Sequence, residues 1–385
     1  METGTIGRRI RTFREHRGLT LQQLGDAVDL RKDQLSKIET GVRSVEVSEA
    51  AMIADALGVT ISDLLGKERN KSLALAARVM TPIDDGAAAQ AQRRVRQVLE
   101  ADSLITSAVG STATPPTLVG SEILDAARGK RAHRAASAQG EELAQFAREK
   151  LGLLGAPTTD LPELVERQFG ADVLIWPTGT AVSGLCAHGD GVALVFASSS
   201  FPVGHQRFTL AHELAHHLLD DPIEVVVDRD LYDKGNPSEA RANGFAAELL
   251  MPADVLRDVV AGSRIDAETF AVLMRTMGVS YRALIVRLHA LRLITTEERA
   301  AWEARTPSSV LREAGDPAVS ELVLPSNATR VPRRLWRAAQ QGYVDGKVGI
   351  GLLAGLLDEE PEELYVKLSK DGILAPVPDV DWSDL

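Results

Sequence analysis

The sequence predicts a multidomain, mainly α-helical protein that contains one small α+β domain. Three observations support this fold class. Leu19 to Gly41 is typical of two short helices joined by a tight turn. Short apolar runs separated by turn residues between 168 and 200 predict a small sheet. From about residue 254 to 292, apolar side chains recur at helical spacing, which predicts further packed helices.

Composition limits the classes of function. The chain has 385 residues, of which 44% are hydrophobic, so it can build two or three domains with real cores. A net charge of -11 argues against indiscriminate nucleic-acid binding by the whole molecule, so any affinity for DNA must come from a local basic face. The single cysteine, Cys186, excludes an intramolecular disulfide framework and fits a reducing cytoplasm. No signal peptide and no apolar run of about 18 residues is evident, so we expect a cytoplasmic protein without membrane contact.

The N-terminal pattern can be assigned residue by residue. Thr20 can cap a helix over 21–28, residues 29–30 form the turn, and a second helix over 31–39 ends before Gly41. An earlier helix over 6–17 turns Ile10 inward and its arginines, including Arg14, largely outward. Later helices at 46–57 and 62–66 complete a five-helix unit. The predicted shared core is Leu24, Val28, Leu30, Leu35 and Ile38.

Over residues 6–66 this pattern resembles the Xre/Cro-like helix-turn-helix family. The resemblance implies that the second helix meets base edges in a double-stranded DNA operator. The family often has glutamine where Leu21 stands and glycine where Asp29 stands, which leaves the sequence preference open. The alternative is a protein-binding helical module without DNA contact. The candidate DNA-binding residues are Arg31, Lys32, Gln34, Ser36, Lys37, Gln22 and Arg43.

A second motif lies in the middle of the chain. His212 and His216 are four residues apart, so on a helix they lie one turn apart and can share one metal ion. Glu213 follows the first histidine and would point to where a water molecule on the metal sits, as a general base. The motif is the HExxH arrangement of zinc peptidases. The three fixed residues of this motif can also arise by chance, so the motif alone does not identify a zinc site. A third ligand is needed.

The best candidate for a third ligand is Glu239, which opens a second helical segment. Asn243 lies one turn further on and can hydrogen-bond a ligand. Glu248 and Glu224 remain alternatives. The alternative is that Glu239 binds no metal and is a solvated carboxylate in the first turn, where the helix dipole favours it.

Segments 206–216 and 239–252 resemble the ImmA/IrrE family of bacterial metallopeptidases, and segments 160–172 and 182–190 fit the helix and strands that precede its motif. The resemblance covers about residues 140–255. It implies a zincin-like fold, Zn²⁺ held by His212, His216 and Glu239, and Glu213 in the catalytic position.

Four nearby residues have less certain roles. His217 is rotated about 100° from His216 on a helix, so it can support the site but not easily join the ligands. His205 and Tyr232 could donate a hydrogen bond to an oxyanion, although both are more simply surface residues. Arg207 could pair with an acidic residue or be an ordinary surface cation.

The expected organisation is a DNA-binding domain over 1–67, a helical or flexible linker over 68–140, the peptidase domain over 141–300 and a C-terminal helical domain over 301–385. The expected function is a transcription regulator whose zinc endopeptidase cleaves a repressor or antitoxin-like partner, or the chain itself. The alternative is a non-proteolytic regulator in which the zinc domain is a sensor. We also expect a homodimer, because half-site recognition usually needs one, and an edge strand that holds an extended peptide.

Overall fold

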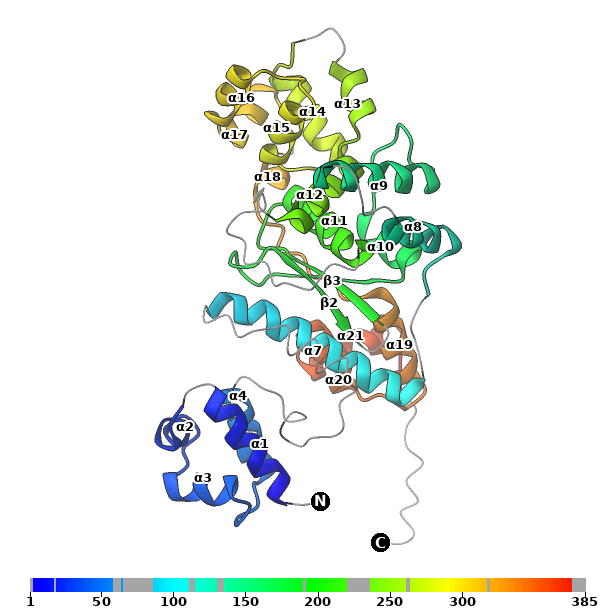
Figure 1. The fold of residues 1–385 in the computed structure, drawn as a ribbon. Helices are drawn as coiled ribbons and strands as arrows, with labels where there is room; N and C mark the ends of the chain where they lie inside the picture. The colour runs from blue at the N-terminus through cyan, green and yellow to red at the C-terminus, as the bar shows by residue number, and fades with distance from the viewer. Residues whose placement is uncertain are drawn as a thin grey trace. The chain divides into compact units, whose positions relative to one another are not determined.

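The computed structural model describes residues 3–16, 19–57, 64, 86–110, 115–129, 135–189, 192–219, 236–260, 264–316 and 319–375. The chain forms two compact units, Met1–Ala74 and Leu75–Leu385. Figure 1 shows the fold. The architecture is mainly helical with one small sheet, as the sequence predicts.

The N-terminal unit contains the expected pair of short helices. Thr20 caps the first of them through a capping box: its Oγ1 accepts a hydrogen bond from the Gln23 backbone N–H at 3.2 Å, and the Gln23 Oε1 accepts one from the Thr20 N–H at 2.9 Å. Asp29 occupies the turn in the left-handed region with φ of 53°. The helices are α1 (Thr3–His16), α2 (Leu21–Ala27), α3 (Lys32–Glu39) and α4 (Val47–Leu57). Of the predicted fifth helix, only Leu64 lies within the described residues.

One prediction for this unit is wrong. Arg14 is 8% exposed rather than turned outward, since it lies four residues after Ile10 on the face that packs into the core. Its Nε and Nη2 donate hydrogen bonds to the two carboxylate oxygens of Glu39 at 2.6 and 2.9 Å. This buried pair connects α1 with α3, the second helix of the helix-turn-helix.

The larger unit is built around a three-stranded sheet of order β1-β3-β2. The strands are β1 (Asp172–Trp176), β2 (Gly184–Gly189) and β3 (Val192–Ser198). β3 pairs parallel with β1 and antiparallel with β2. Every residue of β3 is buried, so helices must cover both faces of the sheet.

The side chains of the sheet alternate between two apolar cores. Val173, Cys186 and Val195 belong to the first core, with the helices α8 (Leu118–Gly129), α9 (Ala136–Lys150), α10 (Leu161–Phe169), α11 (Val203–Leu219) and α12 (Pro237–Leu250). Leu174, Leu194 and Phe196 belong to the second core, with α7 (Gly86–Val109), α19 (Arg333–Val344), α20 (Ile350–Leu357) and α21 (Pro361–Lys370). Figure 1 shows β2 and β3 between these two layers. Helices from the 68–140 segment and from the C-terminal segment therefore cover one face together.

The remaining helices extend the first core. They are α13 (Ala253–Val260), α14 (Ala267–Met277), α15 (Tyr281–Ala290), α16 (Thr296–Glu303), α17 (Pro307–Glu313) and α18 (Val319–Val323). Among the described residues, no single helix is long and apolar enough to cross a membrane; α14 and α15, bent by 104°, meet the length and composition criteria only as a pair.

Candidate metal centre

Helix α11 presents the motif histidines beside the sheet. Its apolar residues Leu214 and Leu218 are fully buried in the first core, which fixes the rotation of the helix. His212 and Glu213 are buried too, while His216 is half-buried. The Nε2 atoms of His212 and His216 face each other at 3.0 Å.

Helix α12 brings Glu239 to the same place. Asn236 caps this helix by accepting a hydrogen bond from the Ser238 N–H at 3.0 Å, and Pro237 starts it. Glu239 is therefore in the first turn, but it is 7% exposed rather than solvated. Its Oε2 lies 3.1 Å from Nε2 of His212, and its Oε1 lies 3.3 Å from Nε2 of His216.

The spacing of these three donors suits a divalent metal ion. A tetrahedral zinc with bonds of about 2.0–2.1 Å places its ligand atoms about 3.3 Å apart. The observed separations of 3.0, 3.1 and 3.3 Å are close to that value. The buried Oε2 of Glu239 makes no hydrogen bond within the described part of the chain, although His212 is near. This convergence of two imidazole nitrogens and a carboxylate fits a bound cation better than it fits hydrogen bonds among the three groups.

Asn243 orients the first histidine. Its Oδ1 lies 3.1 Å from Nδ1 of His212, one helical turn after Glu239 on α12. This contact suits a proton on Nδ1, which donates to the amide oxygen and leaves the Nε2 lone pair for a metal. Helix α12 thus supplies Glu239 as a candidate ligand. It also supplies Asn243, which fixes the tautomer of the candidate ligand His212.

The pKa values of Glu213 and Glu239 are shifted in opposite directions. Burial raises the pKa of Glu213; the His212 and His216 rings oppose this shift, and the Glu239 carboxylate adds to it. Burial alone would also raise the pKa of Glu239, but the adjacent imidazoles of His212 and His216, 3.1 and 3.3 Å from its carboxylate oxygens, hold it well below the usual value. Glu239 is therefore poised to stay ionised as a ligand, whereas Glu213 holds a proton more readily.

Strand β2 lies close to Glu213 at Gly184. A Cβ atom at Gly184 would lie 2.2 Å from Cγ2 of Thr209 and 3.2 Å from Cγ of Glu213, so only glycine allows this approach. The buried Cys186 lies two residues further along the same strand. Neither the close approach nor its dependence on Gly184 was predicted from the sequence, because nothing local to a single glycine signals a distant helix.

Two further features hold the site helices in place. Glycines bring α9 and α12 into backbone contact: a Cβ at Gly140 would lie 1.9 Å from the Arg241 carbonyl oxygen, and one at Gly244 would lie 2.2 Å from that of Ser137. Neither of the two roles predicted for Arg207 on α11, a pair with an acidic residue or an ordinary surface cation, describes its contacts. It donates hydrogen bonds to the carbonyl oxygens of Gly278 at 3.0 Å, Thr159 at 2.6 Å and Thr158.

The other candidates lie elsewhere. Glu248 is not part of the converging group of donors, and its carboxylate forms a buried ion pair with Arg287. Glu224 and Tyr232 are outside the described residues. His217 is half-buried on α11 and is not among the three converging donors. His205 stacks on Phe201 with ring centroids 4.2 Å apart.

The predicted DNA-binding residues surround α3. Arg31, Lys32, Lys37 and Gln22 are exposed, while Gln34 and Ser36 are half-buried. The Gln34 side-chain oxygen accepts a hydrogen bond from the Arg31 N–H at 3.0 Å. Arg43 pairs with Glu49 at 2.7 Å, and Gln22 donates to Asp26 at 2.7 Å. The exposed cations therefore lie on one short helix and at its start.

Comparison with solved structures finds only weak similarities. The chain is 13% identical to ComR from S. thermophilus in its apo form, with 96% of this chain and 92% of that chain covered and a TM-score of 0.17. It is 12% identical to Bacillus thuringiensis PlcR in complex with the peptide PapR7 and DNA, with 95% and 94% covered and a TM-score of 0.17. It is 15% identical to the competence regulator ComR from Streptococcus vestibularis, with 97% and 100% covered and a TM-score of 0.17. At these TM-scores the similarities support no argument. No curated protein matches the chain.

Family comparison identifies both halves of the sequence pattern. Residues 5–65 match a helix-turn-helix domain, and the match includes most of α1 and all of α2, α3 and α4. Residues 166–289 match the IrrE N-terminal-like domain of the peptidase M78 family, which contains the sheet, α11 and α12. The chain is therefore a fusion of an N-terminal helix-turn-helix domain with an IrrE N-terminal-like, M78 peptidase-family domain.

Proposed function

We propose that this protein is a DNA-binding transcription regulator with a zinc-dependent endopeptidase domain. The observation that carries the proposal is the convergence of His212, His216 and Glu239 next to the buried Glu213. Three protein ligands leave a position for water and substrate, which is typical of catalytic zinc sites, whereas structural sites are closed by four. The M78-family match supports a peptidase of this kind.

His212, His216 and Glu239 would hold the ion, and Asn243 would keep the His212 ring in place. When bound, Zn²⁺ supplies Lewis-acid chemistry, which polarises a peptide carbonyl and lowers the pKa of a water molecule to about 7. Glu213 would serve as the proton carrier of the reaction, accepting a proton from the attacking water and passing it to the leaving amine. Its buried position beside Gly184 of β2 limits the movement of the carboxylate.

Strand β2 offers a place for the substrate. In the described part of the chain it pairs only with β3, so its outer edge has no strand partner there. An extended peptide that adds to this edge would run past Gly184 and hence past Glu213. This arrangement favours cleavage in an unfolded or extended segment of a protein substrate.

The helix-turn-helix match supports DNA binding, and binding to an operator would direct the peptidase activity to gene control. Lys32 and Gln34 at the start of α3 are able to read guanine and adenine, and Lys37 and Arg43 suit phosphates. We infer a homodimer on a two-fold operator and a repressor or antitoxin-like protein as the substrate. Fusion of both domains in one chain favours such a regulatory target over general digestion.

The test measures zinc content and cleavage in the full-length chain. Protein purified without added metal is analysed for zinc, and mass spectrometry follows the chain itself and a repressor encoded beside its gene. We expect one zinc per chain, its loss in Glu239→Ala, and a discrete cut. Glu213→Gln should keep the zinc and lower the cleavage rate by roughly 10²–10⁴-fold. Glu268→Gln, an exposed glutamate on α14, is the matched control and should change neither.

Zinc that remains in Glu239→Ala would contradict the ligand assignment, and cleavage that survives in Glu213→Gln would contradict the mechanism. A second candidate function is a regulator whose zinc domain is a sensor and cuts nothing. The burial of His212 and Glu213, 1% and 8% exposed, favours this candidate, because a protein substrate must reach both. Zinc binding with no cut in any partner would support it.

A further inference from the structure

Thr209 on α11 carries a buried hydroxyl group that the packing of the helix does not explain. The side chain is 1% exposed, and its Oγ1 makes no hydrogen bond within the described part of the chain. A buried hydroxyl without an acceptor costs free energy, because the hydrogen bond that it made to water is lost. Valine would fill nearly the same volume without that cost. The presence of threonine here therefore indicates an acceptor close by.

The backbone of α11 does not provide that acceptor. A threonine or serine inside a helix commonly donates to the carbonyl oxygen four residues earlier. Elsewhere in this chain, Thr12 donates to the Arg8 carbonyl oxygen at 2.9 Å, and Ser107 makes the same kind of bond at 2.8 Å. Thr209 makes no such bond to the His205 carbonyl oxygen. Its acceptor is therefore a group outside the helix backbone.

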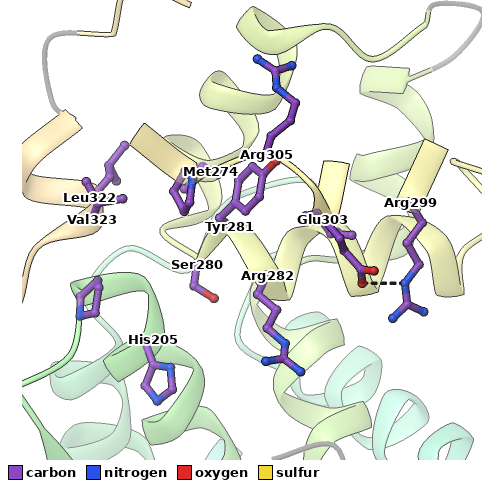
Figure 2. Close-up of a pocket in the computed structure, with 13 residues that line it drawn as sticks. His205, Met274, Ser280, Tyr281, Arg282, Arg299, Glu303, Arg305, Leu322 and Val323 are labelled. Atoms are coloured by element: carbon purple, nitrogen blue, oxygen red, sulfur yellow. Dashed lines mark hydrogen bonds and ion pairs between the residues drawn. The ribbon is translucent and has the colours of Figure 1, made fainter. Parts of the chain in front are cut away.

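The pocket drawn in Figure 2 does not provide it either. This pocket lies beside the first turn of α11, and its lining includes His205, Ser280 and Tyr281. Neither Thr209 nor Glu213 is part of the lining. Water in that pocket therefore does not reach the Thr209 hydroxyl.

The carboxylate of Glu213 is the polar group best placed to accept. Glu213 follows Thr209 by four residues, so the two side chains lie on one face of α11, and helical side chains lean toward the N-terminus. Both also approach one point of β2: a Cβ at Gly184 would lie 2.2 Å from Cγ2 of Thr209 and 3.2 Å from Cγ of Glu213. Within the described residues, the Glu213 carboxylate accepts no hydrogen bond. A donor without an acceptor thus lies one turn from an acceptor without a donor.

We propose that Thr209 is a positioning residue for Glu213, and that its hydroxyl donates a hydrogen bond to the Glu213 carboxylate. Rotation about side-chain bonds brings the two groups together, because residues four apart on a helix are neighbours. Gly184 then limits the carboxylate on one side, and the Thr209 hydroxyl holds it on the other. The inference rests on the proposed function, in which Glu213 carries the proton, and adds the residue that sets the direction of its carboxylate.

A double-mutant cycle in urea, on the full-length chain, tests the contact without any cleavage. Thr209→Val removes the hydroxyl and keeps the shape, and Glu213→Leu removes the acceptor. Tryptophan fluorescence follows the transition, since all four tryptophans belong to the larger unit. We expect Thr209→Val to lower the urea midpoint when Glu213 is present, and to raise it in the Glu213→Leu background, where the hydroxyl has lost its acceptor. Thr106→Val, a half-buried position on α7, is the matched control and should have the same effect in both backgrounds.

Cleavage kinetics separate positioning from folding. With fluorescently labelled casein as an unfolded protein probe, Thr209→Val should lower kcat by about 10–100-fold. Its KM and zinc content should change little, because Thr209 touches neither substrate nor metal. Thr209→Ser keeps the hydroxyl but loses the methyl group that packs against Gly184. It should therefore be less stable than wild type and yet keep most of kcat.

Opposite shifts of the urea midpoint in the two backgrounds, together with rescue of kcat by serine, support the proposal. Two results would overturn it: a shift from Thr209→Val that is the same with Glu213 and with Glu213→Leu, or a loss of kcat in Thr209→Ser as large as that in Thr209→Val. Because the urea cycle needs no cleavage, it decides on the contact separately from the proposed peptidase function.

Discussion

Gly184 on β2 lies so close to Glu213 on α11 that a single added methyl group would come within 3.2 Å of the glutamate's Cγ. The same methyl would lie 2.8 Å from the Phe196 carbonyl oxygen on β3. The contact sets the spacing between the sheet and the helix that carries the motif. The position of the proposed base thus depends on a residue without a side chain.

Gly184→Ala should therefore push α11 away from β2. We expect a loss of about 1–3 kcal/mol in the free energy of unfolding, as for other overpacked sites, and a larger fractional loss of cleavage than of zinc binding. Urea unfolding and peptide cleavage measure these effects. Gly351→Ala on α20 is the matched control, because no atom lies within 4 Å of its added Cβ. If Gly184→Ala cleaves like wild type, the close approach does not position Glu213.

Asn243→Ala should weaken the metal centre without removing a ligand. The His212 ring would lose the partner that fixes its Nδ1 proton, so we expect metal affinity to fall by about 10–100-fold. Competition with a zinc chelator measures this. Asn243→Asp, which keeps an oxygen acceptor at the same place, should retain most of the affinity. An affinity that does not change in Asn243→Ala would show that Asn243 plays no part in orienting the histidine.

The buried carboxylate of Asp172 should make stability depend on pH. Burial raises its pKa to about 7, although the charge of Arg334 opposes the shift and that of Asp102 adds to it. The folded state then keeps a proton that the unfolded state releases near pH 4. This contribution to stability is full below pH 4 and is lost as the pH rises through about 7.

Urea unfolding of wild type should therefore give a lower free energy at pH 8 than at pH 5, by about 2–3 kcal/mol from this group. Asp172→Asn removes the titrating group, so its stability should fall less over the same interval. The comparison uses the two slopes and not the absolute stabilities, because the substitution also changes the contact with Arg334. Equal slopes would mean that Asp172 is ionised throughout.

The DNA proposal predicts a difference between two kinds of binding. Lys32→Ala combined with Gln34→Ala should weaken binding to an operator selected from random DNA by roughly tenfold or more, and weaken non-specific DNA less. Fluorescence anisotropy at fixed salt measures both affinities. Lys370→Ala, an exposed lysine in α21, serves as the charge control. Equal losses on every sequence would argue against base readout.

Local patterns in the sequence predicted the elements best. Thr20, the turn at Asp29 and the two short helices follow from capping and turn preferences that involve neighbouring residues. The proximity of His212 and His216 likewise follows from four-residue spacing on one helix. Glu239 is 23 residues beyond His216, so its place rested on its position at the start of a second helical segment and on the family resemblance, and its role as a ligand stays a prediction.

Long-range packing could not be read in the same way. Arg14 looked like one of several outward arginines, since its partner Glu39 is on another helix. Glu248 looked like a possible ligand, but it is paired with Arg287, 39 residues away. No periodicity indicated that α7 and α19 would share one face of the sheet. Each of these depends on tertiary contacts that a single sequence does not encode locally.

The alternation of side chains along β3 has a practical consequence for anyone who excises the metal centre. A fragment limited to the family match at 166–289 would lack α7, α19, α20 and α21, and Leu174, Leu194 and Phe196 would meet water as a contiguous apolar patch. Such a fragment should aggregate however intact its metal ligands are. Expression boundaries for this centre must therefore include chain from both ends of the larger unit.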